Sequence, residues 1–287
     1  MTGLATYGGH VPVLLDQVIA SLTPRDGDTM VDATFGGGGY SAGLLDAADC
    51  CVLGLDRDPD AVRRGQAQAS RWGDRLSVVE GRFSTLEQTV NEQVGGQVDG
   101  VVFDLGVSSY QLDEAHRGFS FRHDGPLDMR MGADGKSAAD AVNHLDEAEL
   151  AGLIGRLGEE RRARAVARAI VAARKEAPIA RTLELAEIVR GVVRRSPDGI
   201  DPATRTFQAL RLWVNDELGE LEQLGASPFY VSAIDTEVAA VDDDVVPDAQ
   251  INVEVVILGD HPELGADGRA IDFGVKAEDL ERSLRNR

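Results

Sequence analysis

Cysteine and long apolar runs are both scarce in this 287-residue chain. The two cysteines, Cys50 and Cys51, are adjacent, which excludes a disulfide framework and a cysteine metal cluster, and both are expected to pack in a strand. No apolar run is long enough to cross a bilayer, and the N-terminus has no basic region followed by an apolar one. The sequence therefore predicts a cytoplasmic protein, a monomer or homodimer, with no metal site and no membrane partner.

Basic residues are also scarce, and the formal net charge is −20. Such a charge argues against a nucleic-acid partner for the chain as a whole. The basic residues are concentrated, however, because residues 156–211 carry a net charge of +6 and residues 212–287 carry −13. Binding to phosphates follows the local potential within about 8 Å at physiological salt. The basic segment therefore remains a candidate surface for a polyanion.

The most informative motif is a run of four glycines, Gly36 to Gly39, between a predicted strand and a predicted helix. Glycine lets the backbone approach a ligand closely, and the following helix directs its free N–H groups at the same point. Asp56 ends the next predicted strand, twenty residues after Gly36, where an acid binds ribose hydroxyls in nucleotide-binding folds. The unit predicts a nucleoside-containing cofactor.

Asp32 bears on which cofactor this is, because Gly37, Gly39 and Ala42 also fit a relaxed dinucleotide fingerprint. Asp32 stands in the first predicted strand, where a strand buried on both faces normally carries an apolar residue. A buried acid is costly unless it is paired. The sulfonium and amine of S-adenosylmethionine supply such a partner, and the pyrophosphate of NAD does not. The alternative is that Asp32 only accepts hydrogen bonds from loop N–H groups.

The first part of the chain alternates strands with helices. Strands are predicted at 29–35, 51–56, 76–80 and 98–104, with helices near 39–48 and 59–71 and a polar stretch at 84–94. This alternation predicts an α/β fold with a doubly wound, Rossmann-like sheet. Ligands of such sheets sit beyond the carboxyl ends of the strands. The residues that fall at these ends are Asp32, Asp56, Phe83 and Asp104.

The pattern changes after residue 112, where strands give way to a loop at 118–131 and then to helices. We therefore predict a sheet domain made of 1–112 and 206–287 and an inserted helical domain at 113–205. A helix at Thr206–Gln223 and strands at Phe229–Ile234 and Ile251–Leu258 would complete the sheet domain. One helix of the insertion has an apolar face. Off that face lie Arg161, Arg162, Arg164, Arg168 and Arg174, which either track phosphates or pair with Glu159, Glu160 and Glu176 on a solvated face.

Asp104 opens a motif after the fourth strand, where methyltransferases of this architecture place the group that meets the acceptor atom. With the glycine loop and the acidic strand end, the chain closely resembles the ribosomal RNA small subunit methyltransferase H family, which makes N(4)-methylcytidine in 16S rRNA. The matching motifs are His10-Val-Pro-Val-Leu-Leu15, Asp32-Ala-Thr-Phe-Gly36, Leu55-Asp-Arg-Asp-Pro59, Asp104-Leu-Gly-Val-Ser-Ser109, Arg117-Gly-Phe-Ser-Phe121, Asp124-Gly-Pro-Leu-Asp-Met-Arg-Met131, Gly158-Glu-Glu-Arg161 and Pro202-Ala-Thr-Arg-Thr-Phe-Gln208.

The resemblance implies an S-adenosylmethionine-dependent methyltransferase whose inserted domain recognises RNA of the small ribosomal subunit. It implies that Gly38, Gly39 and Tyr40 hold the methionine part of the cofactor and that Asp56 takes the ribose. The adenine and sulfonium side would be lined by Phe83, Asp104 and Gln111. The expected catalytic residues are Asp104, Asp128 and Arg130, the last two in the 118–131 loop. His10 is expected to be a hydrogen-bonded loop histidine.

The resemblance covers residues 10–223 and stops there. The family's Pro-Gly-Gly strand, its Ser-Phe-His-Ser-Leu-Glu-Asp-Arg motif and its basic Asn-Pro-Arg-Ser tail are missing, and the acidic residues 224–287 stand in their place. Either a divergent end or a change of reading frame would produce this difference. Two other functions stay open, an inactive RNA-binding relative and an NAD-dependent oxidoreductase.

Overall fold

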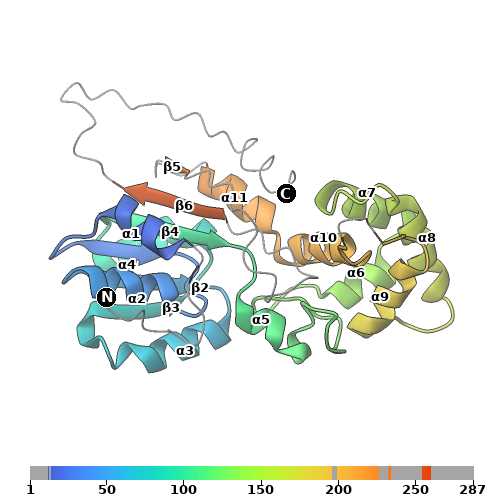
Figure 1. Ribbon diagram of the computed structural model, residues 1–287, viewed down its shortest axis with the longest axis horizontal. Coiled ribbons are helices and arrows are strands. Elements are labelled where there is room, and N and C mark those ends of the chain that lie inside the picture. The colour runs from blue at the N-terminus through green and yellow to red at the C-terminus, as the bar shows by residue number, and fades with distance from the viewer. Residues whose placement is uncertain (1–11, 13, 196–198, 226–231, 234–253, 260–287) are drawn as a thin grey trace, which may run out of the picture. The chain divides into compact units, whose positions relative to one another are not determined.

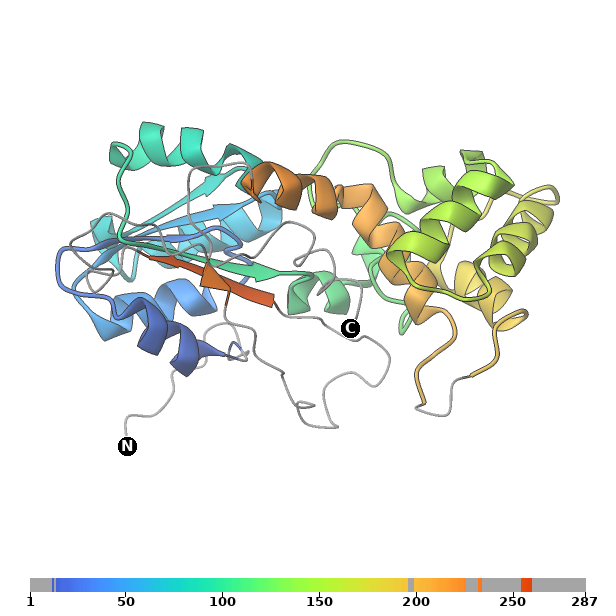
Figure 2. The same ribbon diagram turned by 90° about the horizontal axis from the view of Figure 1, so that it is seen from above.

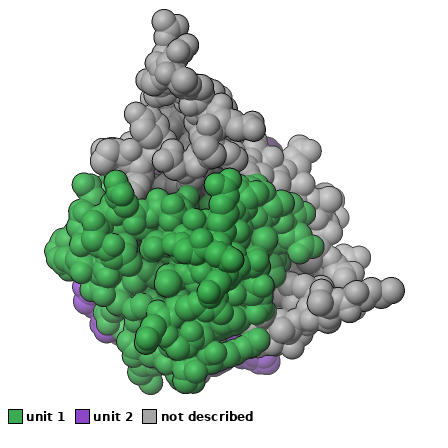
Figure 3. Space-filling view, turned by 90° about the vertical axis from the view of Figure 1, so that its left-hand side faces the viewer, with its two compact units in different colours: residues 1–106, 219–238, 252–284 green, residues 107–218, 239–251, 285–287 purple. Residues whose placement is uncertain are grey.

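The computed structural model describes residues 12, 14–195, 199–225, 232–233 and 254–259. The chain divides into two compact units, which Figure 3 colours separately. The described residues of the first, called the sheet unit, fall within Met1–Gly106, Gly219–Val238 and Asn252–Leu284. Those of the second, called the helical unit, fall within Val107–Leu218.

The sheet unit is built on a mixed sheet with the strand order β3-β2-β1-β4-β6-β5 (Figure 1). Its parallel strands are β1 (Thr29–Asp32), β2 (Cys51–Asp56), β3 (Leu76–Glu80) and β4 (Gly100–Leu105). β6 (Glu254–Gly259) pairs antiparallel with β4, and β5 (Ser232–Ala233) pairs antiparallel with β6. The predicted α/β fold is confirmed. The last two predicted strands lie partly outside the described residues, and their described parts coincide with β5 and β6.

Helices cover both faces of this sheet, with α1 and α2 on one side and α4 on the other (Figure 2). The helical elements are α1 (Leu15–Leu22), α2 (Gly39–Ala47), α3 (Pro59–Ala69), α4 (Leu86–Val94) and the 3₁₀ turns η1 (Gly73–Arg75) and η2 (Phe83–Thr85). The α3 helix begins where the Asp58 carboxylate accepts from the Asp60 N–H at 2.9 Å. The polar stretch predicted at 84–94 is in fact mostly helical, because Leu86 and Val90 are one turn apart and both are buried.

The inner parallel strands β1, β2 and β4 are mostly buried, because both faces of the sheet are covered there. Met30, Val52 and Val78 pack with α1 and α2 in one apolar cluster. Cys50 joins this cluster, and its thiol donates to the Leu44 carbonyl at 3.4 Å. Cys50 is buried just before β2, and Cys51, the first residue of β2, is exposed, so the prediction that both cysteines pack in a strand is wrong.

The helical unit contains helices and loops, and its only described β contact is a bridge between Pro126 and Arg181. Its elements are α5 (Ser109–Asp113), η3 (Ala115–Arg117), α6 (Ala138–His144), α7 (Glu147–Leu157), α8 (Ala163–Ala173), α9 (Thr182–Arg190) and α10 (Thr204–Asn215). Capping boxes start three of the helices, at Ser108, Ser137 and Asp146. The local sequence thus sets where these helices begin.

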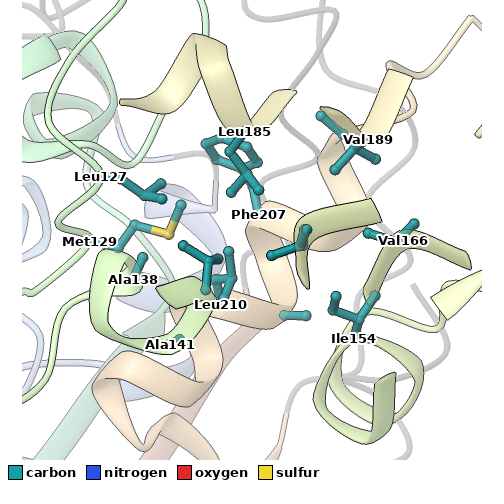
Figure 4. Close-up of a cluster of buried hydrophobic side chains, with 14 of the residues drawn as sticks. Leu127, Met129, Ala138, Ala141, Ile154, Val166, Leu185, Val189, Phe207 and Leu210 are labelled. Carbon is teal, nitrogen blue, oxygen red and sulfur yellow. The ribbon is translucent and has the colours of Figure 1, made fainter. Parts of the chain in front are cut away.

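A core of its own holds the helical unit together (Figure 4). Ile154 of α7, Val166 of α8 and Leu185 of α9 are fully buried, and Leu210 of α10 packs among them. The 118–131 loop also contributes to this core through Met129, which is 0% exposed. The loop is therefore a packed part of the unit and not a surface appendage.

The predicted helix at 206–223 is two helices in the structure. α10 ends at Asn215, because the next residue, Asp216, adopts a left-handed conformation with φ 49°, and α11 (Glu217–Gly225) follows. α10 packs on α6 and α7, so it belongs to the helical unit and not to the sheet domain to which it was assigned. The helical unit spans Val107–Leu218, whereas the sequence predicted the inserted domain at 113–205.

Among the described residues, no helix has the length and apolar character needed to span a membrane.

Candidate active site

Three aspartates stand at or next to the carboxyl ends of neighbouring parallel strands of the sheet unit, with their side chains on the same face. Asp32 of β1 is level with Gly54 of β2 and Val102 of β4. Asp56 and Asp104 stand two residues further along these strands, and side chains two residues apart point to the same face. The strand register therefore gathers three of the predicted site residues at one edge of the sheet, where ligands bind in doubly wound folds.

Asp32 is 0% exposed and already has donors within the protein. One carboxylate oxygen accepts from the Ser41 hydroxyl at 2.7 Å and from the Ser41 N–H at 3.2 Å, and the other accepts from the Thr34 N–H at 3.4 Å. The Asp32 carboxylate is therefore paired within the protein by Ser41 of α2 as well as by the loop N–H of Thr34, and the expected cationic ligand stays a prediction. Even so, burial raises the pKa of Asp32 to about 6.

Asp56 is half-buried beside the glycine loop. Its oxygens accept from the Gly36 N–H at 2.7 Å and from the Asp58 N–H at 2.8 Å. A carboxylate has about four lone-pair sites, so these two bonds leave capacity for the hydroxyls of a ligand. Burial is the main cause that raises the pKa of Asp56 to about 6, and the charges of Asp58 and Asp32 add to it.

Asp104 is held by its backbone, because its N–H donates to the Thr34 hydroxyl at 2.6 Å. No hydrogen bond from a described residue reaches its carboxylate. Burial and the nearby charge of Asp32 raise the pKa of Asp104 to about 7. A carboxyl group with a pKa near neutrality can exist in either protonation state at working pH, which suits a group that accepts and releases a proton.

Tyr40 lies in the first turn of α2 and is 4% exposed. Its hydroxyl donates to no acceptor among the described residues. Burial and the charges of Asp104 and Asp32 raise its pKa, so the hydroxyl keeps its proton. Tyr40 is thus a buried donor electrostatically coupled to two of the three aspartates.

The glycine run has an internal packing reason as well as the predicted functional one. A Cβ on Gly38 would lie 2.6 Å from the Phe35 ring, and one on Gly39 would lie 2.4 Å from Pro12. The ring of Phe35 also occupies the space that a side chain on Gly54 or Gly65 would need. Gly38 has φ +77°, so both backbone conformation and space require glycine there.

Phe83 stands in the loop that follows β3, near Asp56. The Gly81 N–H donates to the Asp56 carbonyl at 2.9 Å, and η2 begins at Phe83. The ring of Phe83 is half-buried and meets Phe103 edge to face, with centroids 6.3 Å apart. The loop that carries this aromatic residue is therefore bonded through its backbone to Asp56, the acid expected to bind ribose.

Gln111, Asp128 and Arg130 belong to the helical unit. Gln111 is 5% exposed and completes the capping box of α5, with its side-chain oxygen accepting from the Ser108 N–H at 3.0 Å. Arg130 forms two parallel bonds to the Asp128 carboxylate, at 2.7 and 2.8 Å, which lowers the pKa of Asp128. The expected roles of these three residues in the reaction stay predictions.

The 118–131 loop is fixed by side chains from distant parts of the sequence. Asn215 of α10 donates to the Met129 carbonyl at 2.9 Å and accepts from the Met131 N–H at 2.8 Å. Thr182 of α9 accepts from the Gly125 N–H at 3.0 Å. Arg117 donates to the carbonyl of residue 130 at 3.1 Å. These contacts hold the Asp128–Arg130 pair in one geometry within the helical unit.

The arginines of the helical unit divide into structural and free ones. Arg174 donates to two carbonyls at the end of α6, each at 2.7 Å, and Arg168 pairs with Glu147 at 3.5 Å. Of the five arginines predicted to lie off the apolar face, the remaining three are exposed and form no ion pair with a described residue: Arg161, Arg162 and Arg164. The expected pairing with Glu159, Glu160 and Glu176 is not observed, and the carboxylate of Glu160 instead accepts from the Arg162 N–H at 2.7 Å.

Comparison with known proteins identifies the family of the chain. The model of a family described as the MraW methylase family matches residues 8–241. The chain belongs to this family. It is 62% identical over 213 residues to the ribosomal RNA small subunit methyltransferase H of Parvibaculum lavamentivorans, a match that covers 74% of this chain and 63% of the relative. The protein of the same name from Rhodospirillum centenum is 61% identical over 214 residues, or 75% of this chain and 65% of the relative.

The chain thus spans less than two thirds of the length of these MraW relatives. Among solved structures, a putative caffeoyl-CoA O-methyltransferase from Staphylococcus aureus is 12% identical and covers 87% of this chain and 86% of its own, with a TM-score of 0.31. A TM-score this low does not establish a common fold for the two proteins. The family membership confirms the resemblance drawn from the sequence motifs.

Sequence reasoning missed several residues that shape this MraW site. Thr34 lies two residues before the glycine run. Its hydroxyl could have been predicted to form a hydrogen bond, because a polar side chain in a buried loop needs a partner. Glu220, which bonds to the loop around Phe83, had no such signal. No cluster of metal-binding side chains is found in the described part of the chain, and His10 lies outside it.

Proposed function

We propose that this chain is an S-adenosylmethionine-dependent methyltransferase that acts in the cytoplasm on the exocyclic N(4) amine of a cytidine in 16S rRNA of the small ribosomal subunit. The observation that carries the proposal is the row of three aspartates, Asp32, Asp56 and Asp104, on one face at the carboxyl edge of the sheet. Membership of the MraW methylase family and the similarity to proteins named ribosomal RNA small subunit methyltransferase H support the reaction type and the RNA.

The charge of this edge selects between cofactors. Burial is the main cause that raises the pKa values of Asp32, Asp56 and Asp104 to about 6, 6 and 7, so a negative charge on each of these carboxylates is unfavourable without a nearby cation. A ligand with a sulfonium and an ammonium group relieves that cost, whereas the pyrophosphate of NAD adds two negative charges to it. The edge therefore supports S-adenosylmethionine and opposes a dinucleotide.

The residues present fit this cofactor. The spare lone pairs of Asp56 suit ribose hydroxyls, and the half-buried ring of Phe83 suits the adenine face. The Tyr40 hydroxyl offers a buried donor beside the glycine loop. When bound, S-adenosylmethionine supplies an electrophilic methyl group.

The acceptor amine of cytosine is a poor nucleophile, because its lone pair is conjugated into the ring. A group that accepts one of its protons returns electron density to nitrogen. The Asp104 carboxylate is the best candidate for this role, because it receives no hydrogen bond from a described residue and has a pKa near 7. The target base must leave its stack to be reached. We assign the fixed Asp128–Arg130 pair to the recognition of that RNA.

The net acidity of the chain does not exclude RNA as a partner. Arg161, Arg162 and Arg164 are exposed at the start of α8 without an acidic partner in the described part of the helical unit. Contacts between basic side chains and phosphates depend on the local potential and release counterions from the nucleic acid. Exposed arginines without an acidic partner are suited to such contacts. We propose this group as part of the RNA surface.

The deciding test has two stages. Calorimetry with S-adenosylhomocysteine and with NAD distinguishes the methyltransferase from the oxidoreductase, and we expect binding of the first ligand only. Transfer of a labelled methyl group to small ribosomal subunits then distinguishes an enzyme from an inactive RNA-binding relative. Mass spectrometry of 16S rRNA from a deletion strain should show an unmethylated cytidine. Cofactor binding without turnover on any small-subunit substrate would favour the inactive relative.

A further inference from the structure

Glu220 of α11 makes a buried contact that the proposed reaction does not use. The residue is 4% exposed. One carboxylate oxygen accepts from the Arg82 guanidinium at 3.2 Å, and the other accepts from the Ser84 N–H at 3.1 Å. All three residues belong to the sheet unit. A single side chain therefore bonds to the residues on both sides of Phe83.

The loop that Glu220 holds is the one that borders the candidate cofactor site. It leaves β3 through Gly81, whose N–H donates to the carbonyl of Asp56 at 2.9 Å. Gly81 cannot carry a side chain without disturbing Leu55, because a Cβ there would lie 2.5 Å from the Leu55 side chain. The loop is thus anchored to β2 at its start and to α11 at Arg82 and Ser84, with Phe83 between the anchors.

A carboxylate is well suited to this task, because it offers two acceptor oxygens at a fixed separation. One oxygen neutralises the Arg82 guanidinium, and the other satisfies the Ser84 N–H at the first turn of η2. Without the carboxylate, both donors lose a buried acceptor, and the turn that carries Phe83 loses its connection to α11.

We propose that Glu220 is a positioning residue that fixes Phe83 as the wall against which a nucleobase stacks. The inference rests on the proposed function for the identity of the ligand, an adenosine moiety, and adds the residue that sets the geometry of its base site. The ring of Phe83 itself meets Phe103 edge to face, and the segment that carries it is bonded to Glu220 on both sides. The contact with Glu220 restrains that loop before any ligand binds, so less ordering remains to be done on binding.

The test uses two variants of the full chain, Glu220→Ala and Glu220→Gln. The first readout is hydrogen exchange of peptides covering residues 81–85, which requires no ligand. The second is calorimetry with adenosine and with S-adenosylhomocysteine. We expect Glu220→Ala to raise hydrogen exchange in this loop. The same variant should lower the affinity for both ligands by the same factor, about tenfold. Glu220→Gln should lose less ligand affinity than Glu220→Ala, because its amide oxygen can still accept a hydrogen bond from the Ser84 N–H.

A matched control separates positioning from a general loss of stability. Asp201 of the helical unit is 5% exposed, accepts from the Arg190 guanidinium at 2.7 Å and accepts from the Ala203 N–H at 2.9 Å. It has the same chemistry as Glu220 without a contact to the cofactor edge. Asp201→Asn should lower the melting temperature and leave both the 81–85 exchange and the adenosine affinity unchanged.

The possible outcomes are distinct. Unchanged loop exchange and unchanged adenosine affinity in Glu220→Ala would overturn the proposal. Equal losses of affinity in Glu220→Ala and Asp201→Asn would overturn it too, because the effect would then be one of global stability. If the wild-type chain binds adenosine, and Glu220→Ala raises loop exchange without changing the adenosine affinity, then Glu220 restrains the loop but does not position the base site. That result would overturn the proposal. A wild-type chain that binds neither ligand would refute the proposed cofactor, while the exchange data would still judge the contact itself.

Discussion

The substitution Asp104→Asn should make the protein more stable at high pH and far less active. Asparagine has nearly the shape of aspartate and keeps the backbone N–H that donates to Thr34 at 2.6 Å. It removes only the ionisable group. The two expected effects have opposite signs, so a general disruption of the fold cannot imitate them.

The size of the stability effect follows from the pKa of Asp104, which burial and the charge of Asp32 raise from 3.8 to about 7. Because the folded state holds this proton more tightly than the unfolded chain, stability falls as pH rises between about 4 and 7. A difference between 3.8 and about 7 corresponds to as much as about 4 kcal/mol at pH 8. The Asp104→Asn variant carries no such penalty, because an amide side chain does not ionise.

Urea unfolding at pH 5 and at pH 8 measures this effect. The wild-type chain should lose stability between the two pH values, and Asp104→Asn should lose clearly less. Asp46→Asn is the control, because Asp46 is an exposed residue of α2. Parallel pH dependence of the wild type and of Asp104→Asn would refute the argument from burial.

Turnover supplies the second half of the prediction. If Asp104 accepts a proton from the target amine, kcat should fall by much more than the affinity for S-adenosylmethionine. The wild-type rate should rise with pH through about 7 as the carboxyl group ionises. Equal losses of turnover and affinity would instead assign Asp104 to cofactor binding.

Four further predictions concern the cofactor, the core, the RNA surface and the C-terminal strand. Asp56→Ala should weaken S-adenosylhomocysteine by about ten- to a hundredfold in calorimetry, and unchanged affinity would remove Asp56 from the site. Gly54→Ala should cost about 1–3 kcal/mol in urea unfolding, because its Cβ would lie 2.5 Å from the Phe35 ring, whereas Gly152→Ala, with open space around it, should not destabilise. Arg161→Ala and Arg164→Ala should each reduce the slope of log affinity for RNA against log salt by about 0.7–0.9, and an unchanged slope would exclude that residue from the phosphate contacts. Truncation after Gln223 should abolish cooperative melting, because it removes β6, which pairs with β4 along its whole length; a monomer that melts like the full chain would contradict this.

Much of the fold was readable from the sequence, because its signals are local. Buried parallel strands are short and apolar, and the four that were predicted lie where β1 to β4 are found. The glycine run and Asp56 stand in the order that a nucleoside-binding unit requires, and the motifs named the right family. α4 was missed because only Leu86 and Val90 mark its buried face, and two apolar residues are too few to set a helical period.

What only the tertiary structure decided is which side chains meet. The sequence placed Asp32 in a strand, but only the packing of α2 shows that the Ser41 hydroxyl lies 2.7 Å from its carboxylate. Thr34 and Asp104 are 70 residues apart, and Ser84 and Glu220 are 136 apart, yet each pair shares a hydrogen bond. Asp216 breaks the predicted long helix by adopting a left-handed conformation with φ 49°. Local pattern determines where a strand or helix forms, because that depends on burial and period alone. The partners of a buried polar group depend on how distant segments pack, and no local pattern in one chain encodes that distance.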